Sequence, residues 1–319
     1  MNIIKQTFNF RTNDGETIST ISWIPENISP KAIIQIVHGM AEYANRYDHF
    51  ARFLCDNGFA VYANDHRGHG YTLHNSKVGF FAKKDGWECV VNDLKKLNSI
   101  IKEKHQNIPI IMFGHSMGSF MARTFAIDFG RNIDALILCG TAFDPGKKAN
   151  IGIALSKILG FLVKPYTKSH LLNYLTFGNY NKTYKPRYSK FDFISRDQNV
   201  VKKYTDDPLC GLICSNSFFG DLLTGLKYIN SSKNIKRMPL DLPIFIISGE
   251  ADPVGNYGDG VKKVSELFIQ CGYKNTTLKL YPEARHELVN EINKEEVYYD
   301  ILRWIEKIKI VSWKVSKWE

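Results

Sequence analysis

Three residues, Ser116, Asp252 and His286, have the types and the order that nucleophilic hydrolysis requires. A serine hydroxyl is a weak nucleophile at neutral pH, and it becomes reactive when a base takes its proton and an acid orients that base. Where a strand, a tight turn and a helix present the serine, the acid and then the histidine follow it along the chain. The sequence therefore predicts that His286 acts as general base and then general acid, and that Asp252 keeps the His286 imidazole in the required tautomer.

Ser116 lies in Gly-His-Ser-Met-Gly, between an apolar run at 108–113 and a segment with helical apolar spacing at 119–129. The run is too short for a buried helix and is typical of a buried parallel strand. The strand and the helix favour a nucleophile elbow over a glycine-rich turn with an ordinary exposed serine. Such an elbow places the Met117 N–H at a helix N-terminus, where it can stabilise an oxyanion.

A second oxyanion donor is expected in the loop that follows the apolar strand at 32–37. His38, Gly39 and Met40 lie there. The glycine permits the backbone to approach a substrate oxygen, so the Met40 N–H is the candidate donor, paired with that of Met117.

The acid and the base each follow a later predicted strand. Glu250 is an alternative to Asp252, but Asp252 is followed by Pro253, which fixes the turn, and is preferred. Among the histidines, His286 alone follows a late strand in this way. Its neighbours, including Glu287, are interpreted as solvated or structural.

Four of the histidines that precede the elbow could suggest a metal cluster, but their spacing lacks the helical H-x-x-x-H pair of a metal site. We interpret them as loop-packing residues and expect no metal. They are His38, His66, His69 and His74.

Strand-like and helix-like segments alternate through most of the chain, which predicts an α/β fold with a mostly parallel sheet covered by helices on both faces. An Asp-Gly turn between 3–10 and 16–24 predicts an antiparallel hairpin at one edge. Further strands are expected at 32–37, 59–64, 108–113, 135–139, 243–248 and 277–281, and helices at 43–57, 87–104, 119–129, 260–271 and 293–307.

The alternation stops near Phe143 and returns near Asp241. We therefore predict a core made of residues 1–142 and 242–319, and a mainly helical cap insertion at 143–241. Helices are expected in the cap at 151–163, 198–204 and 217–229, whereas 173–193 has little periodicity.

The 319-residue chain carries a formal net charge of +10. The lysines are spread along the chain and no nucleic-acid motif is present, so we expect no nucleic-acid partner. The charge is compatible with mild attraction to anionic lipid surfaces, but we prefer the interpretation that it reflects a lysine-rich solvated surface.

The six cysteines are scattered and lie mostly in apolar surroundings, which predicts free thiols in a reducing cytosol. No apolar run approaches the roughly 18 residues of a membrane span, and the first residues lack the pattern of a secretory signal. We expect a cytoplasmic protein, with peripheral membrane contact left open.

Several stretches resemble the monoacylglycerol lipase and lysophospholipase group of the α/β-hydrolase superfamily. They are HGMAEYANRYDHFARFL (38–54), NDHRGHG (64–70), FGHSMGS (113–119), SRDQNVVKKYTDDPLCG (195–211), SGEADPVGNYGDGV (248–261) and LYPEARHELVNE (280–291). The resemblance implies hydrolysis of a single-chain lipid ester through an acyl-enzyme, without a cofactor. By motif position it supports Ser116, Asp252 and His286 as the triad, with Met40 and Met117 at the oxyanion hole.

The resemblance is weaker at 143–190, so the headgroup and the acyl length stay open. The apolar segment 151–163 is expected to line an acyl channel, to contact a membrane, or simply to pack within the cap. The tail at 307–319, with Trp313 and Trp318, suits an interface or a packed terminal helix with a frayed end.

The alternative function is hydrolysis of a small soluble ester, an amide or a peptide N-terminus. An aminopeptidase needs cap carboxylates to hold the substrate ammonium group. The cap offers Asp192, Asp197, Asp206, Asp207 and Asp221. A non-catalytic binding protein on the same fold is disfavoured by the intact triad and by the two glycines of the turn.

Overall fold

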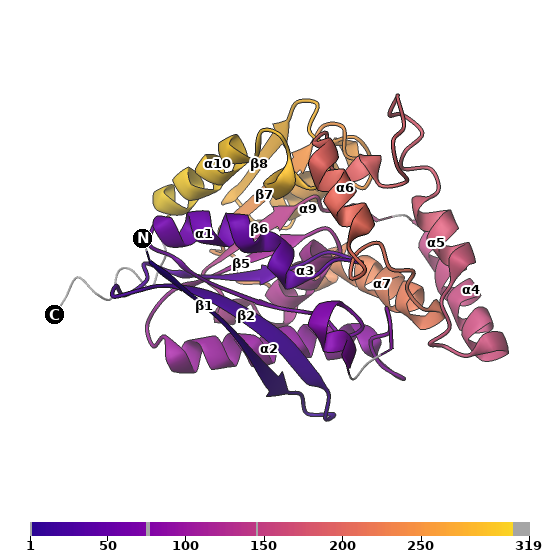
Figure 1. Ribbon diagram of the computed structural model, residues 1–319, viewed down its shortest axis with the longest axis horizontal. Coiled ribbons are helices and arrows are strands. Elements are labelled where there is room, and N and C mark those ends of the chain that lie inside the picture. Colours follow the sequence, from indigo (N-terminus) through magenta and orange to yellow (C-terminus); the bar gives the residue numbers. More distant parts are fainter. Residues whose placement is uncertain (1, 75–76, 145, 309–319) are drawn as a thin grey trace.

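The computed structural model describes residues 2–74, 77–144 and 146–308, and the Trp313 and Trp318 tail lies outside them. Eight strands form one central sheet (Figure 1). They are β1 (Ile3–Arg11), β2 (Thr17–Pro25), β3 (Ile33–Val37), β4 (Ala60–Asn64), β5 (Ile110–His115), β6 (Ala135–Cys139), β7 (Ile244–Gly249) and β8 (Thr276–Tyr281). Their order across the sheet is β1-β2-β4-β3-β5-β6-β7-β8. The six strands β3 to β8 are parallel to one another, and β1 and β2 form the predicted antiparallel hairpin at one edge.

Helices cover both faces of the sheet. One apolar core lies under α1 (Asp48–Asp56) and α10 (Lys294–Lys307). The other lies under α2 (Gly86–Lys104), α3 (Met117–Phe129) and α9 (Asp259–Gln270). The predicted α/β class, with a mostly parallel sheet between two helical layers, is confirmed.

The central strands are apolar at nearly every position because both of their faces are buried. In β5, Ile110 and Met112 face the core under α2, while Ile111 and Phe113 face the core under α1. This alternation follows from the two-residue period of a strand. It also explains why the sequence showed continuous apolar runs rather than alternating ones.

The predicted helix at 43–57 is wrong in detail, because the structure has a short 3-10 turn, η1 (Ala44–Tyr47), before α1. The carboxylate of Asp65 accepts a hydrogen bond from the Ala44 amide at 2.8 Å. This contact holds the chain out of the α1 helix. Other short 3-10 turns are η2 (Gly70–His74), η3 (Gly130–Asn132), η4 (Asp192–Ile194) and η5 (Leu288–Asn290).

Between β6 and β7 the chain forms α4 (Lys147–Val163), α5 (His170–Phe177), α6 (Gln198–Asp206), α7 (Asn216–Ile229) and α8 (Ser232–Ile235). Of these, α4 and α5 lie beyond one end of the sheet in Figure 1. Helix α5 was not predicted, since Leu172 is its only fully buried residue and no apolar periodicity results. Helix α7 contributes to the core under α2 and α3, while a smaller apolar cluster around Phe193 and Tyr204 forms beside it. The treatment of 143–241 as a separate cap remains our proposal. Among the described residues no helix is long and apolar enough to cross a bilayer.

Candidate active site

Ser116 lies between β5 and α3 in a strained backbone conformation, with φ 52° and ψ −124°. A residue other than glycine adopts such angles at a free-energy cost of about 1–3 kcal/mol. The Ser116 amide donates to the carbonyl of Cys139 at 2.9 Å, and the Ser119 hydroxyl donates to the carbonyl of Ser116 at 2.6 Å. The predicted strand, tight turn and helix are therefore present, and the turn is held on both sides.

The two glycines of the turn are required by close backbone contacts. A Cβ on Gly114 would lie 2.5 Å from the carbonyl oxygen of Gly118. A Cβ on Gly118 would lie 2.0 Å from the carbonyl oxygen of Val37 and 2.4 Å from that of His38. The start of α3 thus packs directly against the end of β3, where the candidate oxyanion loop begins.

His286 and Asp252 are brought together by the loops that follow β8 and β7. The His286 Nδ1 atom lies 2.8 Å from Asp252 Oδ2, and both side chains are buried. Because a carboxylate only accepts, Nδ1 carries the proton and Nε2 is left with the lone pair that a general base needs. The arrangement is that of an orienting acid and a base.

Asp252 rather than Glu250 faces the histidine. Asp252 is fully buried, and it also accepts hydrogen bonds from the Val254 amide at 2.8 Å and the Ser248 hydroxyl at 3.3 Å. Glu250 is exposed to solvent. These contacts favour the Asp252 assignment made from the sequence.

The pKa of His286 is raised above its ordinary value. Burial alone would lower this pKa, but the charge of Asp252 and its hydrogen bond outweigh burial, with smaller contributions from Glu287 and Glu42. The ring of His115 lies beside it, with the two ring centroids 4.7 Å apart. Burial and repulsion from His286 and Arg46 lower the pKa of His115, so that ring remains neutral.

Ser116 and His286 are neighbours in space through Cys139 and Gly140. The Ser116 amide bonds to Cys139, and a Cβ on Gly140 would lie 3.0 Å from the His286 ring. Within residues 2–74, 77–144 and 146–308, no hydrogen bond joins the Ser116 hydroxyl to the imidazole. Such bonds are commonly long before substrate binds.

The loop of His38, Gly39 and Met40 lies against the elbow. A Cβ on Gly39 would lie 3.2 Å from the Ser116 Cβ. The Gly39 amide is already used, because it donates to Glu42 Oε1 at 2.6 Å. Among the amides of this loop, that of Met40 therefore remains the candidate donor, with Met117 as the first residue of α3.

The buried histidines ahead of the elbow shape the loop through their own hydrogen bonds. His38 Nδ1 donates to the carbonyl of Gly39 at 2.8 Å, and His38 Nε2 accepts from the His66 amide at 3.0 Å. Burial lowers the pKa values of His38, His66 and His69, so all three rings are neutral. Within the part of the chain that the structure describes, no group of three or more His, Cys, Asp or Glu is arranged to hold a metal ion.

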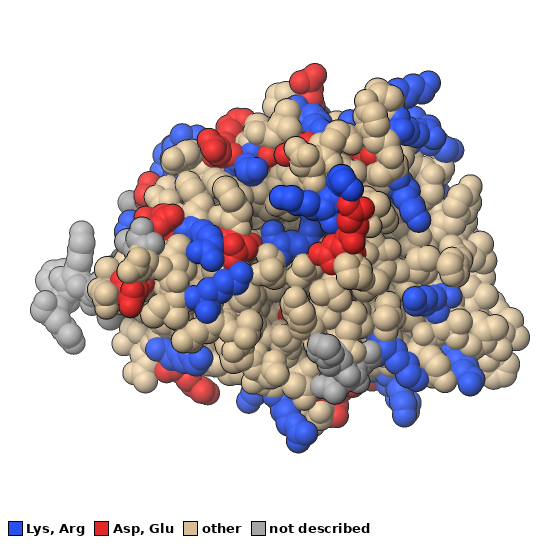
Figure 2. Space-filling view, viewed as in Figure 1, with Lys and Arg blue, Asp and Glu red and all other residues tan. Residues whose placement is uncertain are grey.

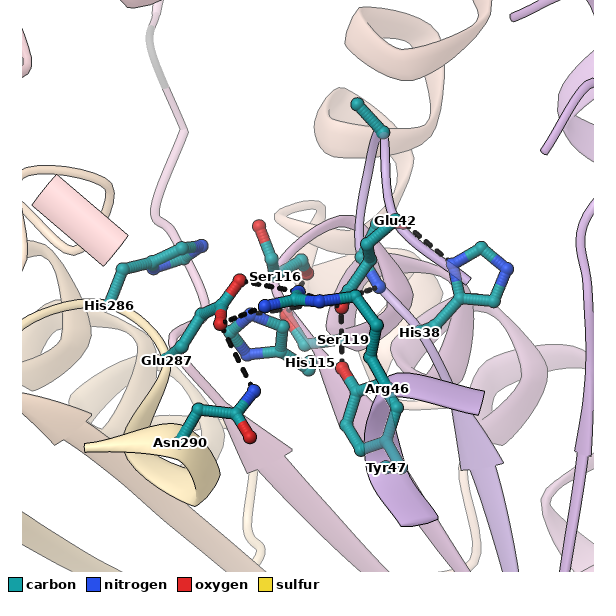
Figure 3. A network of polar contacts seen from close by, with 12 residues as sticks. His38, Glu42, Arg46, Tyr47, His115, Ser116, Ser119, His286, Glu287 and Asn290 are labelled. Atoms are coloured by element: carbon teal, nitrogen blue, oxygen red, sulfur yellow. Dashed lines mark hydrogen bonds and ion pairs between the residues drawn. The ribbon is translucent and has the colours of Figure 1, made fainter. Parts of the chain in front are cut away.

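Sequence reasoning missed a buried polar network beside Ser116 and His286 (Figure 3). Arg46 lies between Glu42 and Glu287, and Glu287 is buried rather than solvated. Two signals were available: Glu42 and Arg46 are spaced by four residues, and Glu287 directly follows His286. Neither signal shows that Arg46 contacts Glu287, because these two residues are far apart in the sequence.

Comparison with known proteins relates the sequence of this chain to a family. The profile of the family described as serine aminopeptidase, S33, matches residues 28–293. The monoacylglycerol lipase of Mycolicibacterium smegmatis is 26% identical over 292 residues, which cover 89% of this chain and 90% of that protein. The monoglyceride lipase of Rattus norvegicus is 25% identical over 299 residues, covering 92% of this chain and 88% of that protein.

The fold is also found among solved structures. A thermostable carboxyl esterase from Bacillus coagulans, solved in complex with glycerol, matches with a TM-score of 0.88 and 29% sequence identity. The match covers 96% of this chain and 99% of the esterase.

Proposed function

Because this chain belongs to the serine aminopeptidase S33 family of α/β hydrolases, we propose that it hydrolyses the carboxylic ester of a monoacylglycerol or a lysophospholipid. The observation that carries the proposal is the buried His286–Asp252 pair beside the strained Ser116. Relatives named monoacylglycerol or monoglyceride lipase, which match over most of both chains, support an ester as the substrate.

In the proposed mechanism, His286 Nε2 takes the proton of the Ser116 hydroxyl as that oxygen attacks the ester carbonyl. Asp252 holds the imidazole and stabilises its positive charge. The amides of Met40 and Met117 donate to the oxyanion of the tetrahedral intermediate. The protonated His286 then donates its proton to the leaving alcohol oxygen as the intermediate collapses to acyl-Ser116. The neutral imidazole next takes a proton from a water molecule, which attacks the acyl ester, and the fatty acid leaves as the Ser116 hydroxyl is restored.

The cap carboxylates that an aminopeptidase would need are mostly engaged elsewhere. Asp192 accepts from the Tyr188 and Ser189 amides, and Asp197 caps α6. The remaining pairs are Asp206 with Lys202, and Asp207 with Tyr43. Asp221 differs: it is half-buried beside Gly86, its Oδ2 atom has no hydrogen-bond partner among the described residues, and burial raises its pKa to about 7. These contacts favour a neutral ester over a peptide with a charged amine.

Helices α4 and α5 present large apolar side chains to solvent. Phe161 is 90% exposed and Leu162 is 67% exposed, and only Ala149 and Ser156 of α4 are fully buried. Leu155 and Leu159 of α4 pack against the core, but packing does not explain the apolar side chains on its outward face. The right side of Figure 2, over α4 and α5, is mostly tan with several blue side chains. We propose that this surface contacts an anionic lipid bilayer transiently, as apolar burial combined with basic residues favours.

The substrate is tested with 1-monoacylglycerol and lysophosphatidylcholine that carry the same acyl chain, with Ser116→Ala as the blank. We expect Ser116-dependent release of fatty acid from at least one of the two. Preference for one lipid decides between the two headgroups. If neither is cleaved above the blank while a short soluble ester is, the lipid proposal is refuted.

The lipid surface is tested by co-sedimentation with vesicles of phosphatidylserine and phosphatidylcholine. Phe161→Ser should weaken vesicle binding about tenfold, since burying an aromatic side chain contributes about 1.5–3 kcal/mol. Ile269→Ser on α9 is the control, because Ile269 is 55% exposed but lies outside the cap. Equal binding by wild type and Phe161→Ser would refute the bilayer contact.

A further inference from the structure

Arg46 joins the two loops that the proposed reaction needs, although it touches none of the triad side chains by a polar contact that the structure describes. Its Nη1 atom donates to Glu42 Oε2 and to Glu287 Oε1, and its Nη2 atom donates to Glu287 Oε2, each at 2.7 Å. The pair with Glu287 is therefore bidentate. Figure 3 shows the guanidinium between the two carboxylates, with Ser116 and His286 close by.

Glu42 anchors the oxyanion loop. Its Oε1 atom accepts from the Gly39 amide at 2.6 Å and from the Tyr47 hydroxyl at 2.8 Å. Because Gly39 directly precedes Met40, the position of Glu42 sets where the candidate Met40 donor lies.

Glu287 anchors the loop of the general base. It directly follows His286, its amide donates to the carbonyl of Ile194 at 2.7 Å, and its Oε2 atom accepts from the Asn290 side chain at 3.0 Å. The backbone on both sides of the His286 side chain is thus fixed relative to the Glu287 carboxylate, and through that carboxylate relative to Arg46.

The remaining face of the guanidinium is covered by an aromatic ring. The Arg46 Cζ atom lies 4.8 Å from the ring centroid of Tyr204, and the Tyr204 hydroxyl donates to the carbonyl of Ala41 in the oxyanion loop at 3.0 Å. A bidentate pair combined with a stacked ring uses the planar shape of arginine, which lysine lacks. Arg46 is therefore held on one side by the two carboxylates and on the other by Tyr204 of α6.

We propose that Arg46 is a positioning residue that sets the placement of the oxyanion loop relative to His286. The inference rests on the proposed ester hydrolysis, because it assigns Arg46 a part in that same site. Displacing either loop moves an oxyanion donor or the base away from the reacting carbonyl, and a misplacement of about 1 Å can reduce the rate about 100-fold.

The competing interpretation is that Arg46 only neutralises two buried carboxylates. Removing an arginine from such a group leaves uncompensated buried charge, which destabilises the fold whatever the loops do. A double variant separates the two roles. In Arg46→Met/Glu287→Gln, one carboxylate is neutral, and Glu42 retains its two donors, Gly39 and Tyr47.

The test measures kcat and KM for p-nitrophenyl butyrate, and the thermal midpoint, in wild type, Arg46→Lys, Arg46→Met and the double variant. Arg67→Met is the matched control, since Arg67 forms a buried pair with Asp93 of α2, at 2.7 Å, that includes neither loop. A short ester is used because its cleavage does not depend on the lipid headgroup. If the wild-type protein cleaves p-nitrophenyl butyrate but neither lipid, the proposed lipid substrate is refuted, and the Arg46 variants still test the positioning role.

We expect Arg46→Met to lower kcat about 100-fold with KM changed less than about threefold, and Arg46→Lys to recover part of the loss. The double variant should regain thermal stability without regaining kcat, and Arg67→Met should lose stability while keeping kcat. If Arg46→Met does not fold, Arg46→Lys and the double variant decide. Wild-type kcat in the double variant overturns the proposal, as does a kcat loss in Arg67→Met equal to that in Arg46→Met. A wild-type chain that cleaves no ester refutes the proposed function together with this inference.

Discussion

Replacing Gly118 by alanine tests whether the contact between α3 and β3 sets the catalytic geometry. The added Cβ would lie 2.0 Å from the carbonyl oxygen of Val37, whereas ordinary contact begins at 3.4 Å. The nearest atoms are backbone, so no side chain can turn aside to make room. The start of α3 and the end of β3 must therefore separate by roughly 1.4 Å.

Two effects on stability oppose each other in this variant. Alanine favours a helix over glycine by about 1 kcal/mol, and overpacking costs about 1–3 kcal/mol. Because the clashing atoms are backbone, the overpacking cost lies at the upper end of this range or above it, and we expect a net loss of about 2 kcal/mol or more in the free energy of unfolding, which urea titration measures. The separation moves the Met117 amide away from the oxyanion loop, and we expect kcat to fall about 100-fold or more.

The assay compares kcat, KM and urea unfolding for wild type, Gly118→Ala and Gly160→Ala. Gly160 lies within helix α4, and a Cβ there would meet its nearest atom at 3.5 Å, so the same substitution adds no overlap. Gly160→Ala should keep kcat and gain stability. A Gly118→Ala variant with the kcat of wild type would show that the proposed oxyanion geometry does not depend on this contact.

Three further predictions concern the loops around the triad. Asp252→Asn should lower kcat about 10,000-fold through the wrong imidazole tautomer. Because the Asp252 carboxylate raises the pKa of His286 and the base must be neutral, the acidic limb of the kcat/KM profile should have its midpoint above 6.5 in wild type and at lower pH in Asp252→Asn. Gly140→Ala should lower kcat about tenfold, because its Cβ would lie 3.0 Å from the His286 ring and would displace the imidazole from its position. Gly15→Ala, also at positive φ but with nothing within 4 Å, should affect stability alone, and equal kcat losses would contradict the crowding argument. Tyr204→Phe should lower the free energy of unfolding by about 1 kcal/mol by removing one hydrogen bond to Ala41, measured by urea titration; an unchanged value would mean the bond contributes nothing.

The sequence predicted the fold well because the pattern of buried strands is local. Each central parallel strand, from β3 to β7, appears as a mostly apolar run since both of its faces are covered, as Ile110 to Phe113 illustrate. The predicted order of Ser116, Asp252 and His286 needed only the rule that loops after parallel strands meet at one edge of the sheet.

The parts that the sequence did not reveal depend on partners distant along the chain. Glu287 looked solvated because it is a charged residue in a loop, and only the fold brings Arg46 to it. Helix α5 was missed because its apolar side chains, such as Leu171 and Leu175, face solvent rather than the core. Apolar residues recur with helical spacing when one face of a helix packs against the protein's own core, and these side chains do not pack there.

The insertion between β6 and β7 is fastened to the proposed catalytic loops mainly through residues 192–211, and Thr183 and Tyr184 add hydrogen bonds to Tyr257 and Ala251 in the loop of Asp252. The amides of His286 and Glu287 donate to the carbonyls of Phe193 and Ile194, and the Gly211 amide donates to Ala41. A chimaera that exchanges helices α4 and α5 with those of another hydrolase would thus alter the proposed lipid-facing surface without replacing residues that contact the proposed catalytic loops. Exchange of residues 183–211 would shift the groups that hold these loops, so turnover and substrate range are separately engineerable only if the graft ends before residue 183.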